Sequence, residues 1–229
     1  MRRMASLAVL LVVFAAFALA QQPTPAASQA PQAPQAQQAP RMPASPRGSA
    51  ATQVGGKWVD PTTPGGAQRY TDGKWITVDY GRPILRGRTN IFGTGADYGK
   101  KVNDDAPVWR AGANQTTRFR TEVPLVIGGK TLPAGEYSLF VELKPGAWTL
   151  ILSTEPFQQK YDPNNKTETW GAYNYDPKFD VLRAPMTHAK GAASVDQFTI
   201  QFADVTATGG KMMLLWEKDV ATVPFTIAK

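Results

Sequence analysis

The sequence predicts an all-β fold: a single antiparallel β-sandwich, jelly-roll-like, that follows a signal peptide and a disordered linker. Apolar residues alternate with polar ones at a period of two, most regularly in Gln197–Phe202, as in a strand with one buried face. Turn residues, mainly Gly and Pro, recur at intervals of roughly eight to twelve residues. No stretch keeps the 3.6-residue period of a helix, so an antiparallel sandwich is the expected class.

Individual strands follow from this alternation. The pair Asp72-Gly73 favours a hairpin turn, and Pro124 indicates an edge position or a bend. The motif Gly56–Asp60 is repeated in similar form at Gly73–Asp79, so its first copy predicts a short extra strand or arm. The expected strands are Trp75–Tyr80, Arg118–Arg120, Leu125–Ile127, Glu136–Glu142, Trp148–Leu152, Asp180–Arg183, Gln197–Phe202, Lys211–Glu217 and Val223–Ile227.

The N-terminus has the pattern of a cleavable secretory signal. A short cationic stretch at residues 1–4 precedes Ala5–Ala20, in which every residue except Ser6 is apolar. The run ends on Ala18-Leu19-Ala20, the small-x-small pattern that signal peptidase cleaves, so residues 1–20 are expected to be removed. A retained anchor is the alternative, but the apolar run is shorter than the roughly 20 residues that span a bilayer. No later stretch is long and apolar enough to cross a membrane.

Residues 21–56 are predicted to form a disordered linker rich in Gln, Pro and Ala. Up to residue 49 this segment has no aliphatic or aromatic side chain larger than Ala except Met42. Such a composition buries too little surface to offset the entropy of ordering. The linker is either a tether that holds the domain away from a surface or a filler, and the β-sandwich domain is expected at residues 57–229.

Composition excludes several classes of site. The chain has no cysteine, so disulfides, a Cys nucleophile and a thiolate metal site are excluded, and the domain depends on hydrophobic burial. The formal charge of +7 overstates its basicity, because four of the 25 basic residues lie in the signal and linker. The remaining 21 basic residues against 18 acidic ones give +3, which is no reason to expect a nucleic-acid partner.

The segment Tyr80–Thr117 interrupts the strand pattern and is longer than the loops that compact domains usually contain. Its arginines present fixed forks of donors that suit carboxylate, phosphate or sulfate, and its aromatic rings can stack on sugars. A structural role is the alternative, since arginine also satisfies the backbone carbonyls of a long loop. The candidate ligand-binding residues are Arg82, Arg86, Arg88, Arg110 and Asn114 as donors, with Tyr98 and Trp109 as stacking walls.

Seven blocks that begin in this segment and continue through the domain form a recognisable pattern: Tyr80–Arg88, Ile91–Gly93, Tyr98-Gly99, Trp109–Thr117, Gly129–Leu139, Trp170–Asp176 and Leu214–Glu217. They resemble the hallmark of a bacterial domain-of-unknown-function family, DUF2911. The resemblance implies an exported, β-rich protein without an assigned activity. The sequence departs from that pattern by inserting residues 101–106 before Trp109, which would lengthen one side of the candidate site.

Motifs for catalysis are sparse. His188 is the single histidine, and no nucleophile-elbow sequence surrounds the serines that would complete a triad with it. One histidine without cysteine cannot form a His-rich zinc site, and no calcium loop or dinucleotide fingerprint occurs. A glycosidase pair could come from six carboxylates, although exposed strand carboxylates are usually only solvated. These carboxylates are Glu136, Glu142, Glu155, Glu168, Asp176 and Asp180.

A second aromatic cluster lies at Trp170–Tyr175. If this segment is an alternating strand, Trp170 faces away from Tyr173 and Tyr175, and one of the two sets is core. The outward set could then line a saccharide platform.

These observations lead to three expectations for function. The first is a non-catalytic binding module with no cofactor, whose partner is an anionic or saccharide ligand of the cell envelope, in the periplasm or outside the cell. The second is a polysaccharide-acting hydrolase, which needs two carboxylates facing one groove. The third is a structural or assembly protein that uses edge strands, with an exposed apolar patch.

Overall fold

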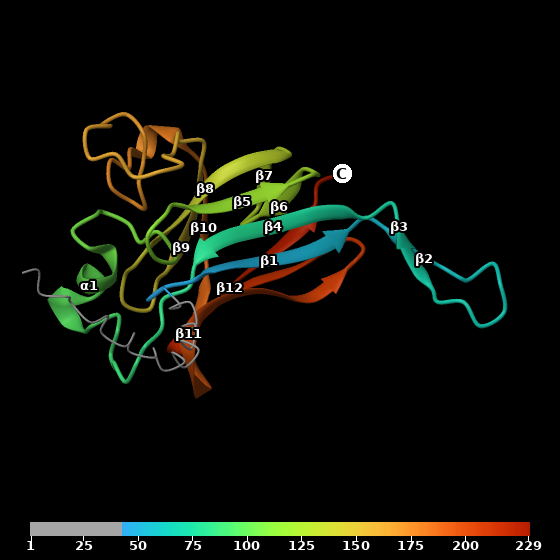
Figure 1. Ribbon diagram of the computed structural model, residues 1–229, viewed down its shortest axis with the longest axis horizontal. Coiled ribbons are helices and arrows are strands. Elements are labelled where there is room, and N and C mark those ends of the chain that lie inside the picture. Colours follow the sequence, from blue (N-terminus) through green and yellow to red (C-terminus); the bar gives the residue numbers. More distant parts are fainter. Residues whose placement is uncertain (1–42) are drawn as a thin grey trace, which may run out of the picture. The chain divides into compact units, whose positions relative to one another are not determined.

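A computed structural model describes residues 43–229 (Figure 1). The predicted signal peptide, residues 1–20, and most of the predicted linker lie outside the described residues. Within the described range, no helix is long and apolar enough to cross a membrane.

The described chain is an antiparallel sandwich of two main sheets, so the predicted all-β sandwich is confirmed. The six-stranded sheet has the order β1 (Arg47–Val54), β4 (Lys74–Gly81), β5 (Thr117–Thr121), β8 (Gly135–Glu142), β9 (Thr149–Ser153) and β10 (Asp180–Pro185). The four-stranded sheet has the order β11 (Thr187–Thr206), β12 (Gly209–Ile227), β6 (Leu125–Ile127) and β7 (Lys130–Leu132). The helical elements are η1 (Gly95–Asp97), α1 (Lys100–Asn103) and η2 (Pro177–Phe179).

Strand β1 corrects the predicted linker. It occupies residues 47–54, inside the range 21–56 expected to be disordered, and it pairs with β4 along its whole length. The backbone supplies the cross-strand hydrogen bonds, so small side chains such as Ala50 and Ala51 do not prevent pairing. Val54 is fully buried and anchors the end of the strand. The folded domain therefore begins before residue 57.

Strand β12 is longer than expected, because one 19-residue strand replaces the two predicted at Lys211–Glu217 and Val223–Ile227. It pairs with β11 from the Thr206–Gly209 end to the Thr187–Thr222 end, with three shifts of register. Glu217 has a positive φ of 53° at one such irregularity. Bulges of this kind let a long hairpin bend without ending it.

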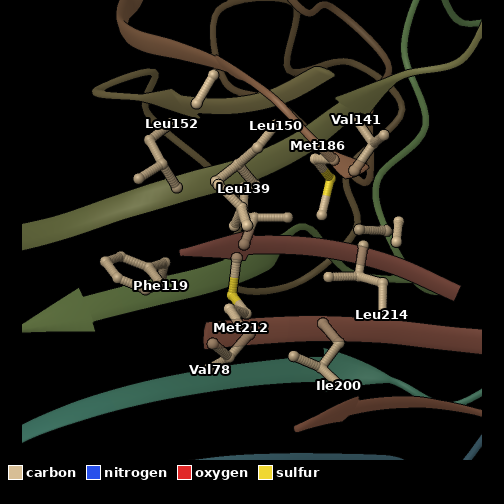
Figure 2. Packing of buried hydrophobic residues seen from close by; sticks show 14 of the residues in the cluster. Val78, Phe119, Leu139, Val141, Leu150, Leu152, Met186, Ile200, Met212 and Leu214 are labelled. Carbon is tan, nitrogen blue, oxygen red and sulfur yellow. The ribbon is translucent and has the colours of Figure 1, made fainter. Parts of the chain in front are cut away.

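The core lies between the two sheets and is made by the inward-facing residues of each strand. Figure 2 shows this packing: Val78 and Phe119 come from the six-stranded sheet, and Ile200 and Leu214 come from the facing one. In β4, residues 76, 78 and 80 are buried, which is the alternation the sequence predicts. The figure also labels Leu139, Val141, Leu150 and Leu152 from the six-stranded sheet, Met212 from the facing sheet, and Met186 from the connection between β10 and β11.

An aromatic cluster closes one end of the sandwich. Phe92 has its ring centroid 4.7 Å from that of Trp148, 5.4 Å from that of Trp109 and 6.0 Å from that of Trp216. Trp109 and Trp216 are stacked at 6.2 Å with an interplanar angle of 9°. Two of these rings come from the long loop, so the loop is attached to the core by its own side chains.

Loops cover the outer face of the six-stranded sheet over β8 and β9. There Phe140 and Ile151 form a second buried cluster with Ala106, Val108 and Ala172 from loops. Beside it, the outward side chains of β1, β4 and β5 are more accessible.

The repeat at Gly56–Asp60 forms the predicted short extra strand, β2 (Lys57–Val59), paired with β3 (Arg69–Thr71) in a two-stranded arm (Figure 1). Trp58 on this arm is 66% exposed.

Candidate functional site

Arg82 is used as a structural tie. Its Nε donates to the carbonyl of Phe198 at 3.3 Å, and its Nη2 donates to the hydroxyl of Thr199 at 3.1 Å. Both acceptors lie in β11, so this guanidinium joins the start of the loop to the facing sheet. A Cβ on Gly48 would come within 2.1 Å of the Arg82 side chain, which explains the small residue at this position of β1.

Arg88 closes the turn that precedes it. Its Nε and Nη2 donate to the carbonyls of Leu85, at 3.0 Å, and Ile84, at 2.7 Å. These two hydrogen bonds use only Nε and Nη2, so Nη1 has no partner within residues 43–229. The side chain remains exposed. Arg86 is also exposed, and no hydrogen bond or ion pair of its side chain occurs within residues 43–229.

Trp109 belongs to the core. Its side chain is 1% exposed, and its backbone exchanges two hydrogen bonds with Val141, at 2.9 and 2.8 Å. One edge of the residue nevertheless borders the cavity described below.

Tyr98 is the first residue of a series of contacts that continues through Trp148 and His188 to Asp219. Its hydroxyl accepts a hydrogen bond from Trp148 Nε1 at 2.7 Å, and burial raises its pKa above the ordinary value of 10.0. Trp148 stacks on His188 with the ring centroids 4.5 Å apart, and His188 Nε2 lies 2.7 Å from Asp219 Oδ1. Lys190 Nζ also contacts both oxygens of Asp219 at 2.8 Å. The single histidine thus lies in a packed network with no serine in it.

A cavity of about 280 Å³ lies between the long loop, α1 and the aromatic end of the core. Its basic residues are Arg88, Lys101 and Arg110, and its one carboxylate is Asp104. The other lining residues are Ser45, Pro83, Ile91, Val102, Trp109, Gly112, Ala113, Asn114 and Trp216. The charge of its walls is therefore net positive.

Arg110 is the best-held of these cations. It is 8% exposed, its Nη1 donates to the carbonyl of Asn114 at 3.1 Å, and its Nη2 lies 3.5 Å from Asp104 Oδ2. Its guanidinium lies over the ring of Tyr173, 5.2 Å from the centroid, and the Tyr173 hydroxyl donates to Asp104. That hydrogen bond raises the pKa of Tyr173. Gly171 leaves room for the guanidinium, since a Cβ there would lie 2.6 Å from Arg110 Nη1.

The structure brings four of the seven predicted site residues to this cavity and leaves three outside it. Those that line it are Arg88, Trp109, Arg110 and Asn114. Those that do not are Arg82, Arg86 and Tyr98, whose positions are given above.

Sequence reasoning missed three charged or aromatic residues of the cavity. Lys101 and Asp104 belong to residues 101–106, which the resemblance marks as an insertion. The prediction that this insertion lengthens one side of the site is the signal by which they could have been found. Trp216 comes from β12, more than 100 residues away, and only the fold brings it there. Its Nε1 is buried and has no hydrogen-bond partner within the described range.

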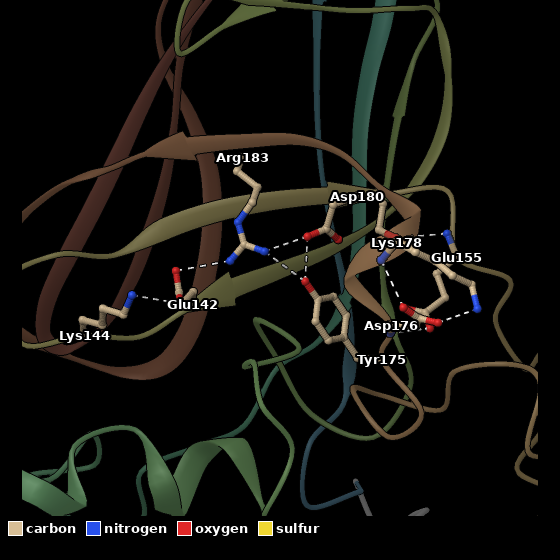
Figure 3. Close-up of polar contacts among 9 residues, drawn as sticks. Glu142, Lys144, Glu155, Tyr175, Asp176, Lys178, Asp180 and Arg183 are labelled. Atoms are coloured by element: carbon tan, nitrogen blue, oxygen red, sulfur yellow. Dashed lines mark hydrogen bonds and ion pairs between the residues drawn. The ribbon is translucent and has the colours of Figure 1, made fainter.

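A second polar group lies on the outer face of the six-stranded sheet (Figure 3). Arg183 lies between two acids there, with Nη2 3.2 Å from Glu142 and Nη1 2.7 Å from Asp180. The hydroxyl of Tyr175 donates to Asp180 at 2.7 Å, and burial together with this acid raises the pKa of Tyr175. These carboxylates are engaged in ion pairs, and none of them lines a cavity described here.

Glu155 belongs to the same group but forms no ion pair within residues 43–229. It is 4% exposed, and although Oε1 accepts from the Asp176 N–H at 2.9 Å, Oε2 has no partner in the described structure. Burial, which outweighs its hydrogen bonds, raises the pKa of Glu155 to about 7. Asp176 and Asp180 act in the same direction through their charge.

The aromatic segment 170–175 is not an alternating strand, which corrects the geometry expected for it. The chain turns between Trp170 and Tyr173, whose backbones pair with each other, so a two-residue period does not apply. Trp170 packs 5.5 Å from Tyr161, and Tyr173 lies partly exposed beside Arg110.

Within residues 43–229, no group of three or more His, Cys, Asp or Glu side chains could hold a metal ion. Neither the curated proteins nor the solved structures contain a significant match to this chain. A family model described as "Protein of unknown function (DUF2911)" matches residues 64–225. This match covers most of the chain, including the long loop and the strands on both sides of it, and confirms the resemblance seen in the sequence: the chain belongs to the DUF2911 family.

Proposed function

We propose that this chain is an exported, non-catalytic binding protein whose cavity between the long loop and α1 takes an anionic group of a cell-envelope ligand. The observation that carries the proposal is the convergence of Arg88, Lys101 and Arg110 on one cavity with a single carboxylate, Asp104. Guanidinium groups suit the planar or tetrahedral oxygens of carboxylate, sulfate and phosphate.

Two of the basic side chains, Arg110 and Lys101, have hydrogen-bonding or ion-pairing capacity that the described residues do not use, and this supports the proposal. Arg110 is nearly buried, and its donors are only partly used, by one carbonyl and one ion pair of 3.5 Å. Lys101 has no ion-pair partner within 4.0 Å in the described part of the chain. An anion entering the cavity would complete the pairing of both groups, and a buried charge gains most from such a partner.

Binding is favoured over hydrolysis at this site, because a glycosidase mechanism uses two carboxylates that flank the scissile bond. Only one of the residues that line the cavity is a carboxylate, Asp104, and it already contacts Arg110 and Tyr173.

Export is proposed from the pattern of residues 1–20. If it is correct, the protein recovered from the cell envelope or the medium begins at Gln21 when its N-terminus is sequenced. An N-terminus at Met1 in that fraction would contradict cleavage.

The cavity is tested with glucuronate and inorganic phosphate as probes, by calorimetric titration of the full mature chain. Lys101→Gln removes one exposed cation without breaking a contact, and we expect about tenfold weaker binding of the anion that binds wild type. Lys130→Gln, an exposed lysine on β7, is the matched control and should bind as wild type does. Equal affinity of Lys101→Gln and Lys130→Gln, or the absence of binding to wild type, refutes the anion site.

A further inference from the structure

The cavity is the first of three hollows that adjoin through shared lining residues, and the three together are called the cleft. A hollow of about 240 Å³ shares Ser45, Ala113 and Asn114 with it. A third hollow, of about 330 Å³, shares Arg47 and Gln115 with the second. The three therefore follow one another along two segments of chain, residues 43–48 and 112–118.

Size favours one ligand across all three hollows. Ligand pockets usually measure about 300–1,000 Å³, so each hollow alone lies near or below the small end of that range. Taken together they lie well inside it. A compact anion would occupy only the first.

Charge changes along the cleft. The first hollow has three cations and one carboxylate, whereas the third has two of each: Arg47 and Arg118 against Asp79 and Glu136. The ligand that fits this gradient is acidic at one end and neutral but polar at the other.

Arg118 gives the third hollow a rigid floor. It lies beside Asp79 across β4 and β5 and beside Ser138 across β5 and β8. Its Nη1 donates to Ser138 Oγ at 2.5 Å, its Nε to Glu136 at 3.2 Å, and its guanidinium lies 3.7 Å from the ring centroid of Phe157. A side chain held on three sides loses little entropy when a ligand binds.

The third hollow is also lined by polar side chains that remain free to hydrogen-bond a ligand. The side chains of Arg47, Asp79, Gln115 and Gln159 have no hydrogen-bond partner within residues 43–229. They include a donor, an acceptor and two amides that are both, which is the mixture that sugar hydroxyls require. Trp170 lines the middle hollow and offers an aromatic surface of the kind that sugar rings contact.

We propose that the cleft binds an extended acidic oligosaccharide, with an acidic sugar at Arg110 and Lys101 and neutral sugar units along Trp170, Gln115 and Gln159. This inference rests on the proposed function of the first cavity and names its ligand class. An acidic peptide fits less well, since its carboxylates would meet Asp79 and Glu136 in the third hollow.

The test uses two oligosaccharides that each carry one terminal glucuronate, followed by either one or five neutral N-acetylglucosamine units, titrated calorimetrically into the full mature chain. We expect the hexasaccharide to bind wild type at least about tenfold more tightly than the disaccharide. Because each ligand carries a single acid group, the anion site alone would give equal affinities.

Variants then locate the extra affinity. Gln115→Ala/Gln159→Ala leaves every charge in place and should weaken the hexasaccharide about tenfold while leaving the disaccharide unchanged. Lys101→Gln should weaken both ligands by the same factor. Gln68→Ala, an exposed amide on the segment between β2 and β3, is the control and should change neither affinity.

The outcomes separate the two proposals. Hexasaccharide binding no tighter than disaccharide binding, or unaffected by the double glutamine variant, overturns the extended ligand, even if Lys101→Gln still weakens the disaccharide and supports the anion site. If neither saccharide binds, or if Lys101→Gln binds both as wild type does, both proposals fail. Hexaglutamate binding as tightly as the hexasaccharide at equal salt replaces the saccharide by an acidic peptide.

Discussion

Glu155 makes the stability of the domain depend on pH in a direction that can be calculated. The residue is 4% exposed, and burial raises the pKa of its carboxyl from an ordinary 4.5 to about 7. Between these two values the folded chain keeps a proton that the unfolded chain has lost. Stability therefore falls as pH rises through this window, is unaffected by Glu155 below it, and levels off above about pH 7.

The size of the effect follows from the shift. Each pKa unit corresponds to about 1.4 kcal/mol, so the ionised carboxylate costs about 3 kcal/mol in the folded state. Glu155→Gln mimics the protonated acid and preserves the acceptor for the Asp176 N–H. We expect the variant to gain about 2 to 3 kcal/mol relative to wild type between pH 5 and pH 8.

Urea denaturation of both proteins at pH 5, 6, 7 and 8 measures this difference. Other titrating groups are common to the two chains and cancel in the comparison. Parallel stability profiles across this range would refute the reasoning, because they would mean that the folded chain accommodates the carboxylate at Glu155 without cost. If wild type instead gained stability relative to Glu155→Gln as pH rises, folding would lower the pKa of Glu155 rather than raise it.

Two further predictions concern the fold and the loop. A chain that begins at residue 43 should melt as the full-length chain does, whereas one that begins at residue 57 loses β1 and the buried Val54 and should melt about 10 °C lower or more. Equal melting temperatures would exclude β1 from the folded unit. Trp109→Ala removes a ring buried among other aromatics and should cost about 3 to 5 kcal/mol in urea denaturation. A loss below 1 kcal/mol would show that the loop is not anchored through this ring.

Prediction from sequence succeeded where local pattern decides structure. The expected strand Trp75–Tyr80 is observed as β4, and Gln197–Phe202 lies within β11, because alternation of large apolar side chains specifies both a strand and its buried face. It failed at β1, which lacks an alternation of large apolar side chains. That strand is held by backbone pairing with β4, which no property of its own residues reports.

The same distinction applies to the site. The sequence marked the long loop and four residues of the cavity, since basic and aromatic residues are concentrated there. It could not separate Arg82, which bonds to β11, from Arg110, which faces the cavity. Both are arginines in one loop, and their roles depend on which acceptors lie within about 3 Å after folding.

By itself, the sequence determined the all-β class, most strand positions, the family and the region that carries the candidate site. Each of these depends on residue type and spacing along the chain. Only the tertiary structure decided the order of the strands, the membership of β1, and the cleft that joins residues 43–48 to the loop and Trp170. Those features are contacts between residues distant in sequence. They arise when the two sheets pack, and the energy of that packing is shared over the whole core.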